Sequence, residues 1–201
     1  MKVLFFDCET SGLKPGWNKM LQLSWQLVDT CRWKVISKQN FYFRQPGKEK
    51  VEKGAIRVNG LTKEALERLG TVPRSKGIKA FAKDMAMADI CVAHNFAFDS
   101  RFINEEDTKN TIKWPKEYCT MKGTANLCKI PFKYRPDYVS PDQEYKWPRL
   151  SELADHLGIN IQKLHLHDSS ADVELTKRCF RALVKNGYFT KNLTPNPVIT
   201  Y

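Results

Sequence analysis

Three extended segments follow one another within the first 44 residues, and they constrain the fold more than any other feature of the sequence. Residues 3–7 form a short apolar run bounded by Gly and Pro, which predicts a buried strand. Residues 21–27 and 35–44 alternate apolar and polar side chains, the period of a half-buried strand. Because the connections are short, we expect the three strands to pair antiparallel.

The rest of the chain changes to helical spacing. A short apolar strand is predicted at 89–93, and the final helix places Leu175, Cys179, Leu183 and Val184 on one stripe. The predicted helices are 62–69, 78–85, one that begins near Asp99, 121–130, 151–157 and 170–186. This order predicts an α/β domain with a mixed central sheet flanked by helices, over residues 1–189, and an extended tail at 190–201.

The charge balance favours a polyanionic partner. Lys and Arg number 33 against 22 Asp and Glu, a net charge of +11, which indicates nucleic acid before membrane. No apolar run approaches the ~20 residues of a membrane span, and the start lacks the pattern of a secretory signal. Six scattered cysteines form no C-x-x-C pair, so we expect a reducing, cytoplasmic location.

Acidic side chains gather at three junctions of the predicted elements. Asp7 and Glu9 end the first strand, and residues two apart on a strand point to the same face. Asp99 follows the apolar strand, where it could equally be a helix N-cap. His167 precedes Asp172, which lies in the first turn of the last helix. Taken singly, each group also has an ordinary explanation. Acids at a strand end are often solvated, and an acid at the start of a helix often caps it.

Taken together, the three groups favour a metal site. Four carboxylates around one cavity are the donors that two Mg²⁺ or Mn²⁺ ions require, and such a pair clamps a phosphodiester. An imidazole can take a proton from the attacking water. Of the 22 acidic residues, these four leave 18 against 33 basic ones, so the surface around the acidic centre is strongly basic.

The same residues carry a resemblance to a known family. F-F-D-C-E-T-S-G-L, H-N-F-A-F-D and H-D-S-S-A-D are similar to the three motifs of the DEDDh 3′–5′ exonucleases, which include the proofreading subunit of bacterial DNA polymerase III. The motifs span residues 5–172 in the family's order. The resemblance implies a ribonuclease H-like fold, whose first three strands are antiparallel.

The resemblance also implies roles for residues. It makes Asp7, Glu9, Asp99 and Asp172 the ligands of two divalent ions and His167 the general base, while His165 breaks the motif spacing. The implied substrate-binding residues, around the terminal nucleotide, are Thr10, Ser11, Gly12, Leu13, Asn95 and Phe98.

Two regions of the sequence keep alternative interpretations open. The loop 131–148 interleaves Phe132, Tyr134, Tyr138, Tyr145 and Trp147 with basic residues, which suits either stacking of unpaired bases or folding on its own aromatics. The last helix carries Lys177, Arg178, Arg181 and Lys185 without an opposing acid, typical of a solvated face.

The sequence thus predicts a metal-dependent 3′–5′ exonuclease that releases 5′-mononucleotides, preferentially from single-stranded or frayed DNA 3′ ends. A role in proofreading or repair beside a polymerase is compatible with it. The nearest alternative is the same chemistry on RNA, since no motif reveals a contact to the 2′-OH. An alternative of another class is a non-catalytic nucleic-acid-binding module.

Overall fold

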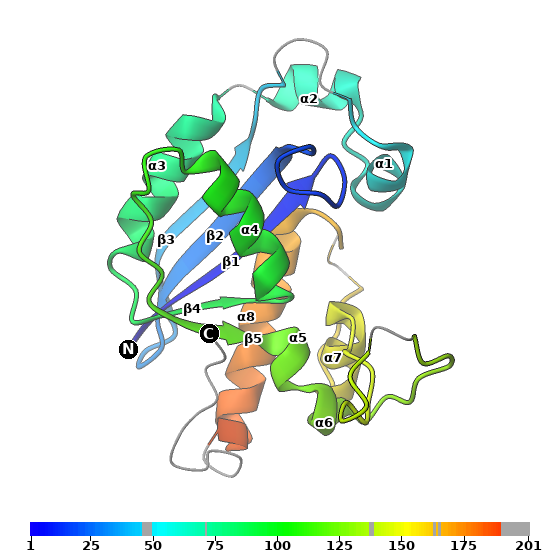
Figure 1. Ribbon diagram of the computed structural model, residues 1–201. Coiled ribbons are helices and arrows are strands. Elements are labelled where there is room, and N and C mark those ends of the chain that lie inside the picture. Colours follow the sequence, from blue (N-terminus) through cyan, green and yellow to red (C-terminus); the bar gives the residue numbers. More distant parts are fainter. Residues whose placement is uncertain (46–49, 71, 137–138, 163, 165, 190–201) are drawn as a thin grey trace.

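The computed structural model describes residues 1–45, 50–70, 72–136, 139–162, 164 and 166–189, and the predicted tail, Tyr138 and His165 lie outside them. Its sheet has the order β3-β2-β1-β4-β5 (Figure 1). β1, β2 and β3 pair antiparallel, whereas β4 runs parallel to β1 and β5 runs parallel to β4, which confirms the predicted mixed sheet. The strands are β1 (Lys2–Thr10), β2 (Met20–Asp29), β3 (Lys34–Tyr42), β4 (Ile90–Ala93) and β5 (Lys116–Cys119).

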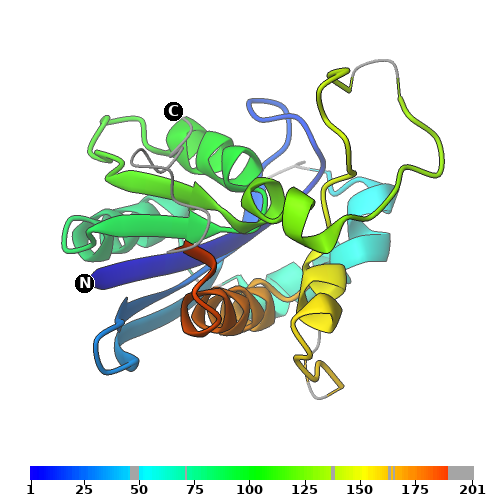
Figure 2. The ribbon, with the colours of Figure 1, turned by 90° about the horizontal axis from the view of Figure 1, so that it is seen from below.

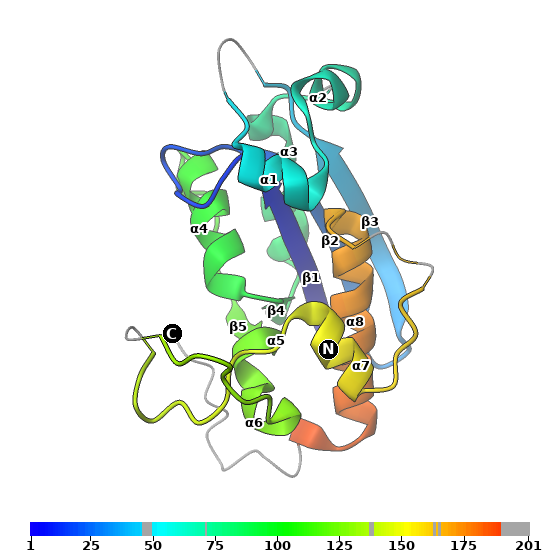
Figure 3. The same cartoon turned by 90° about the vertical axis from the view of Figure 1, so that its right-hand side faces the viewer.

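Helices cover both faces of the sheet. Helices α3 and α4 pack on one face and α8 on the other, so the sheet lies between two layers (Figures 2 and 3). Among the described residues, no helix combines the length and apolar character that a membrane crossing requires. The helices are α1 (Lys53–Asn59), α2 (Lys63–Leu69), α3 (Arg74–Met85), α4 (Phe96–Glu106), α5 (Thr120–Gly123), α6 (Ala125–Cys128), α7 (Leu150–His156) and α8 (Ser169–Lys185).

The first strand is apolar on both faces because each face meets a helix layer. Leu4 and Phe6 pack into the cluster beneath α3 and α4, whereas Val3 and Phe5 pack against α8. Side chains alternate along a strand, so residue 8 continues toward α4 while residues 7 and 9 continue toward α8. The two cores thus fix which side each later residue of β1 faces.

The prediction that β2 is half-buried is wrong, since all but its last residue are buried. Its polar side chains face α8 and form hydrogen bonds there instead of meeting water. Gln26 Nε2 donates to Glu174 at 3.0 Å, and the hydroxyls of Ser24 and Ser169 lie 2.6 Å apart. Burial of polar groups is tolerated when such partners are present, so alternation here marks two kinds of buried face.

Several helix boundaries differ from the sequence prediction. Helix α4 begins at Phe96, well before Asp99, because Asn95 has φ 77° and turns the chain into the helix. The single helix predicted at 121–130 is divided into α5 and α6 at Thr124. Val184 was placed on the buried stripe of the last helix, but its side chain is exposed. The predicted cap of α2 is confirmed, since Thr62 accepts a hydrogen bond from the backbone of Ala65.

Helix α1 and strand β5 were not predicted. No residue of α1 is buried, so it lacks the apolar stripe by which helices are recognised. Its one signal is Gly60, which follows Asn59 with φ 69° and ends the helix in the left-handed conformation. Strand β5 has four residues, of which none is buried.

We expect Leu183→Ala to lower the free energy of unfolding by about 2–5 kcal/mol, because the residue is buried. The neighbouring Val184→Ala is expected to change it by less than about 0.5 kcal/mol. Urea denaturation of both variants measures this difference. Equal losses would contradict the placement of the helix face.

Candidate active site

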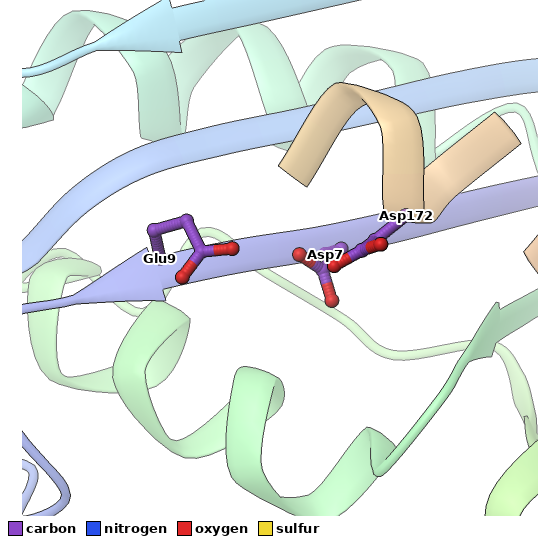
Figure 4. A group of neighbouring side chains, drawn as sticks. All are labelled: Asp7, Glu9 and Asp172. Carbon is purple, nitrogen blue, oxygen red and sulfur yellow. The ribbon is translucent and has the colours of Figure 1, made fainter. Parts of the chain in front are cut away.

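Three of the four predicted acids meet where β1 ends beside α8. Asp7 and Glu9 lie on the face of β1 that α8 covers, and Asp172 lies in the first turn of α8. One carboxylate oxygen from each lies within 4.8 Å of the other two (Figure 4). Residues separated by more than 160 positions in the chain therefore form one cluster of oxygen donors.

Asp99 lies on α4 and is buried, but it is not a member of that group of three. Its Oδ1 accepts hydrogen bonds from the backbone N–H of Cys8 at 3.0 Å and from the Cys8 thiol at 3.2 Å. Residue 8 therefore ties α4 to the strand that carries Asp7 and Glu9. Asp99 remains close enough for its charge to raise the pKa of Asp7.

Burial raises the pKa of all four carboxyls, and nearby carboxylates raise each of them further. Burial is the largest cause at each of them; it acts with the charge of Asp99 at Asp7, whose pKa lies well above its ordinary value. Burial and the charge of Asp172 raise the pKa of Glu9 to about 8. Those of Asp99 and Asp172 rise to about 7 and 6. Such a cluster is unfavourable when ionised, and a bound cation relieves it.

The donor set fits a hard divalent ion. The three clustered groups are carboxylates, and oxygen donors suit Mg²⁺ or Mn²⁺ better than softer metals. Asp7, Glu9 and Asp172 could hold one ion directly. Asp99, whose Oδ1 accepts from residue 8, is the nearby acid that a second ion would recruit.

Asp168 fixes the start of α8 and with it the position of Asp172. Its Oδ1 accepts from the backbone of Ser170 at 3.0 Å, so Asp168 is the N-cap of α8. Its Oδ2 accepts from the hydroxyl of Tyr42 at 2.6 Å and from Gln22 Nε2 at 3.1 Å. Side chains of β2 and β3 therefore anchor this helix end to the sheet.

His167 lies on the segment that enters α8. Its side chain is exposed, its backbone has φ 68°, and its N–H donates to Asp172 Oδ2 at 3.2 Å. The hydrogen bond keeps the segment against the acidic cluster.

A cavity of about 360 Å³ opens beside Glu9. Thr10, Gly12, Leu13 and Phe98, four of the six residues predicted to bind substrate, line it. The two others, Ser11 and Asn95, do not.

Ser11 and Asn95 contribute to the backbone framework beside the site. Ser11 is buried, and its hydroxyl accepts from the backbone of Lys19 at 2.8 Å, which closes the loop between β1 and β2. Asn95 is the residue that begins α4. Its neighbour His94 has Nε2 at 3.0 Å from the carbonyl of Pro148, and burial lowers its pKa to about 4, so it is a neutral structural residue.

The far wall of the cavity comes from α1, which the sequence analysis missed. Asn59 Nδ2 donates to the carbonyl of Thr10 at 3.2 Å, which joins this wall to β1. Asn59-Gly60 was the available signal, since it marks a helix end. The wall residues are Glu52, Gly54, Ala55, Val58 and Asn59.

The prediction that the basic face of α8 has no opposing acid is wrong. Glu174 pairs with Lys177 at 2.6 Å and with Arg178 at 3.0 Å. The guanidinium of Arg181 lies over the ring of Trp33, 5.2 Å from its centre. Lys177 and Arg178 therefore share one carboxylate, and Arg181 contacts an aromatic ring.

The loop 131–148 shares features of both interpretations. Arg135 lies over the ring of Phe132 and donates to three carbonyls further along the loop, so this part folds on itself. Lys122 lies over the ring of Trp147 in the same way. Tyr134 remains exposed and faces solvent.

Comparison with known proteins agrees with this geometry. Residues 4–180 match the family described as Exonuclease (RNase_T). A "DNA polymerase III PolC-type" of Mycoplasmopsis pulmonis is 27% identical over 176 residues, which are 87% of this chain and 11% of that protein.

Solved structures show the same fold. Exonuclease I of E. coli in complex with a dT13 oligonucleotide superposes with a TM-score of 0.74 at 18% identity, over 95% of this chain and 42% of that one. Exonuclease I of Methylocaldum szegediense gives 0.68 at 16%, over 95% and 43%. The chain therefore spans less than half of each of these relatives.

The chain belongs to the Exonuclease family, whose match covers all three acidic motifs. The predictions of a DEDDh-type 3′–5′ exonuclease family and of a ribonuclease H-like fold are confirmed.

The raised pKa values predict how stability depends on pH in the absence of metal. Between about pH 4 and 8 the folded protein binds more protons at these carboxyls than the unfolded chain does. The contribution of these carboxyls to the free energy of unfolding therefore falls as pH rises through this window, on the order of 1–3 kcal/mol. Urea denaturation in EDTA at pH 5 and 8 measures the fall.

Asp172→Asn provides the control for this prediction, because it removes one charge and keeps the side chain's shape. The variant is expected to lose less stability between the two pH values, and added Mg²⁺ should stabilise the wild type more at pH 8 than the variant. An identical pH dependence in the two proteins would contradict the electrostatic account.

Proposed function

We propose that the chain is a divalent-cation-dependent 3′–5′ exonuclease that releases 5′-mononucleotides from single-stranded DNA. The observation that carries the proposal is the cluster of Asp7, Glu9 and Asp172, whose oxygens lie within 4.8 Å of one another beside a cavity lined by Glu9. A carboxylate cluster without a pocket would suit a structural ion. A cluster at the mouth of a pocket suits chemistry on a bound group.

In this proposal the four acids hold the ions and His167 handles the proton. Asp7, Glu9 and Asp172 are the first ligands, and Asp99 completes the set. Bound divalent ions supply neutralisation of the charge that develops on the scissile phosphodiester. His167, exposed and tied through its backbone to Asp172, takes the proton of the attacking water.

The cavity is proposed to bind the terminal nucleotide. Leu13 and Phe98 give it apolar surface on two sides, which suits the faces of a base or sugar. The hydroxyl of Thr10 donates to the carbonyl of Gly12 at 2.7 Å, so this turn keeps a fixed shape at the pocket edge.

DNA is favoured over RNA by the relatives. The E. coli structures are described as complexes with dT13 and dA16 oligonucleotides, and the PolC-type relative is a DNA polymerase. The latter relation also supports a second proposal, that the chain works beside a DNA polymerase in proofreading. An RNA substrate and a non-catalytic binding role are the alternatives, and a cytoplasmic location stays a prediction.

A nuclease assay tests the activity directly. We expect a 5′-labelled single-stranded DNA to shorten stepwise in Mg²⁺ or Mn²⁺ and to remain intact in EDTA. Asp7→Asn removes a proposed metal ligand and His167→Ala removes the proposed general base. Each should lower the rate by at least about 100-fold, since general-base catalysis alone contributes about 10²–10⁴. Asp89→Asn, a surface carboxylate that accepts from the backbone of Lys2 at the other end of β1, serves as the control.

The same assay distinguishes the alternatives. An RNA of matched sequence should be degraded at least several-fold more slowly than the DNA. Faster degradation of RNA would establish the exoribonuclease alternative. Full-length DNA in every metal tested, with oligonucleotide binding retained, would leave the binding module as the explanation.

A further inference from the structure

We propose that the loop between β1 and β2 is a second nucleotide-binding surface, where Trp17 stacks on a base of the single strand that leads into the pocket. The inference rests on the proposed function, since it requires a 3′ end in the cavity. It adds a contact for nucleotides upstream of the one that is released.

Trp17 is unusually open to solvent for its type. Its side chain is 88% exposed, and Leu13 on the same loop is 77% exposed. Burying an aromatic side chain is favourable, so two large apolar groups left in water on one short loop indicate a surface that another molecule covers.

The loop is held rigidly, so the exposure of Trp17 is built into the fold. The backbone N–H of Ser11 donates to the carbonyl of Lys19 at 2.9 Å, and that of Asn18 donates to the carbonyl of Lys14 at 2.8 Å. The side chain of Asn18 accepts from the backbone of Lys14 and donates to Glu52, both at 2.8 Å. Binding to a surface already ordered in this way costs little conformational entropy.

The loop is continuous with the proposed pocket. Leu13 lines the cavity and lies four residues from Trp17, which is at most about 14 Å along the chain. The loop lies between α1 and α4, the two helices that contribute the other walls (Figures 1 and 3). A strand with its end in the cavity can therefore reach the loop without leaving the protein surface.

The charges along this path suit a polyanion. On α4, Arg101 follows Phe98 of the pocket by one turn and is exposed. Lys14 is exposed on the loop itself. Near the tip, Glu105 Oε2 lies 3.9 Å from where a Cβ on Gly16 would stand. The Glu105 carboxylate disfavours a phosphate at the tip but not the uncharged face of a base, while the exposed cations Lys14 and Arg101 suit phosphates.

Single-stranded nucleic acid fits these features better than a protein partner does. Unpaired bases stack on exposed aromatic side chains regardless of sequence, and a basic groove follows their backbone. A tryptophan can also anchor a protein, but the net charge of +11 and the adjoining pocket favour the strand.

Two substrates separate this surface from the pocket. The p-nitrophenyl ester of thymidine 5′-monophosphate occupies the pocket alone, whereas dT12 extends beyond it. We expect Trp17→Ala to lower kcat/KM for dT12 about tenfold, mostly through KM, because stacking of one base contributes about that factor. Hydrolysis of the ester should not change. Trp17→Phe, which keeps a ring, should restore most of the activity on dT12.

Trp33→Ala is the matched control, because Trp33 lies in the turn between β2 and β3 at the opposite end of β1. It should leave the ratio of the two activities as in the wild type. Equal kcat/KM for dT12 in Trp17→Ala and wild type would overturn the inference, as would equal losses on both substrates. If the wild type hydrolyses neither substrate, the proposed function itself fails.

Discussion

Repulsion among carboxylates at the end of β1 is the constraint that the rest of the structure must satisfy. Burial makes the charge of each of Asp7, Glu9 and Asp172 costly. Because like charges also repel, these side chains would move apart if their backbones were free to move. The two apolar faces of β1 prevent this, because Phe5 and Phe6 are fully buried on opposite sides. The fold therefore stores an unfavourable site in a well-packed strand, and cation binding can recover that energy.

The sequence identifies this arrangement largely because the chemistry depends on strand ends and helix starts. Apolar residues before Asp7 and a cap before Asp172 are local signals, and the structure has both. The sequence alone cannot show which face of the sheet a later helix covers. Asp99 arrives on α4, opposite α8, and its bonds to Cys8 depend on that packing.

The elements that sequence reasoning missed have a common physical cause. Helix α1 buries no residue, so nothing in its pattern distinguishes it from a charged loop, yet it supplies a wall of the cavity. The alternation in β2 was misread because its polar side chains are buried against α8 and satisfied there. Periodicity shows which residues of a strand are apolar. Whether the polar residues are exposed to water depends on which hydrogen-bonding groups pack against them.

The base and the tip of the loop between β1 and β2 suit different parts of a nucleotide chain. At its base the chain carries Glu9 and closes the pocket, where only a cation-loaded site can accept a phosphate. At its tip the same loop offers Trp17, whose contact with a base is independent of charge. The hydrogen bond from Asn18 Nδ2 to Glu52 connects the loop to the wall of the cavity. One rigid hairpin thus aligns the uncharged and the charged parts of a nucleotide chain with the groups suited to each.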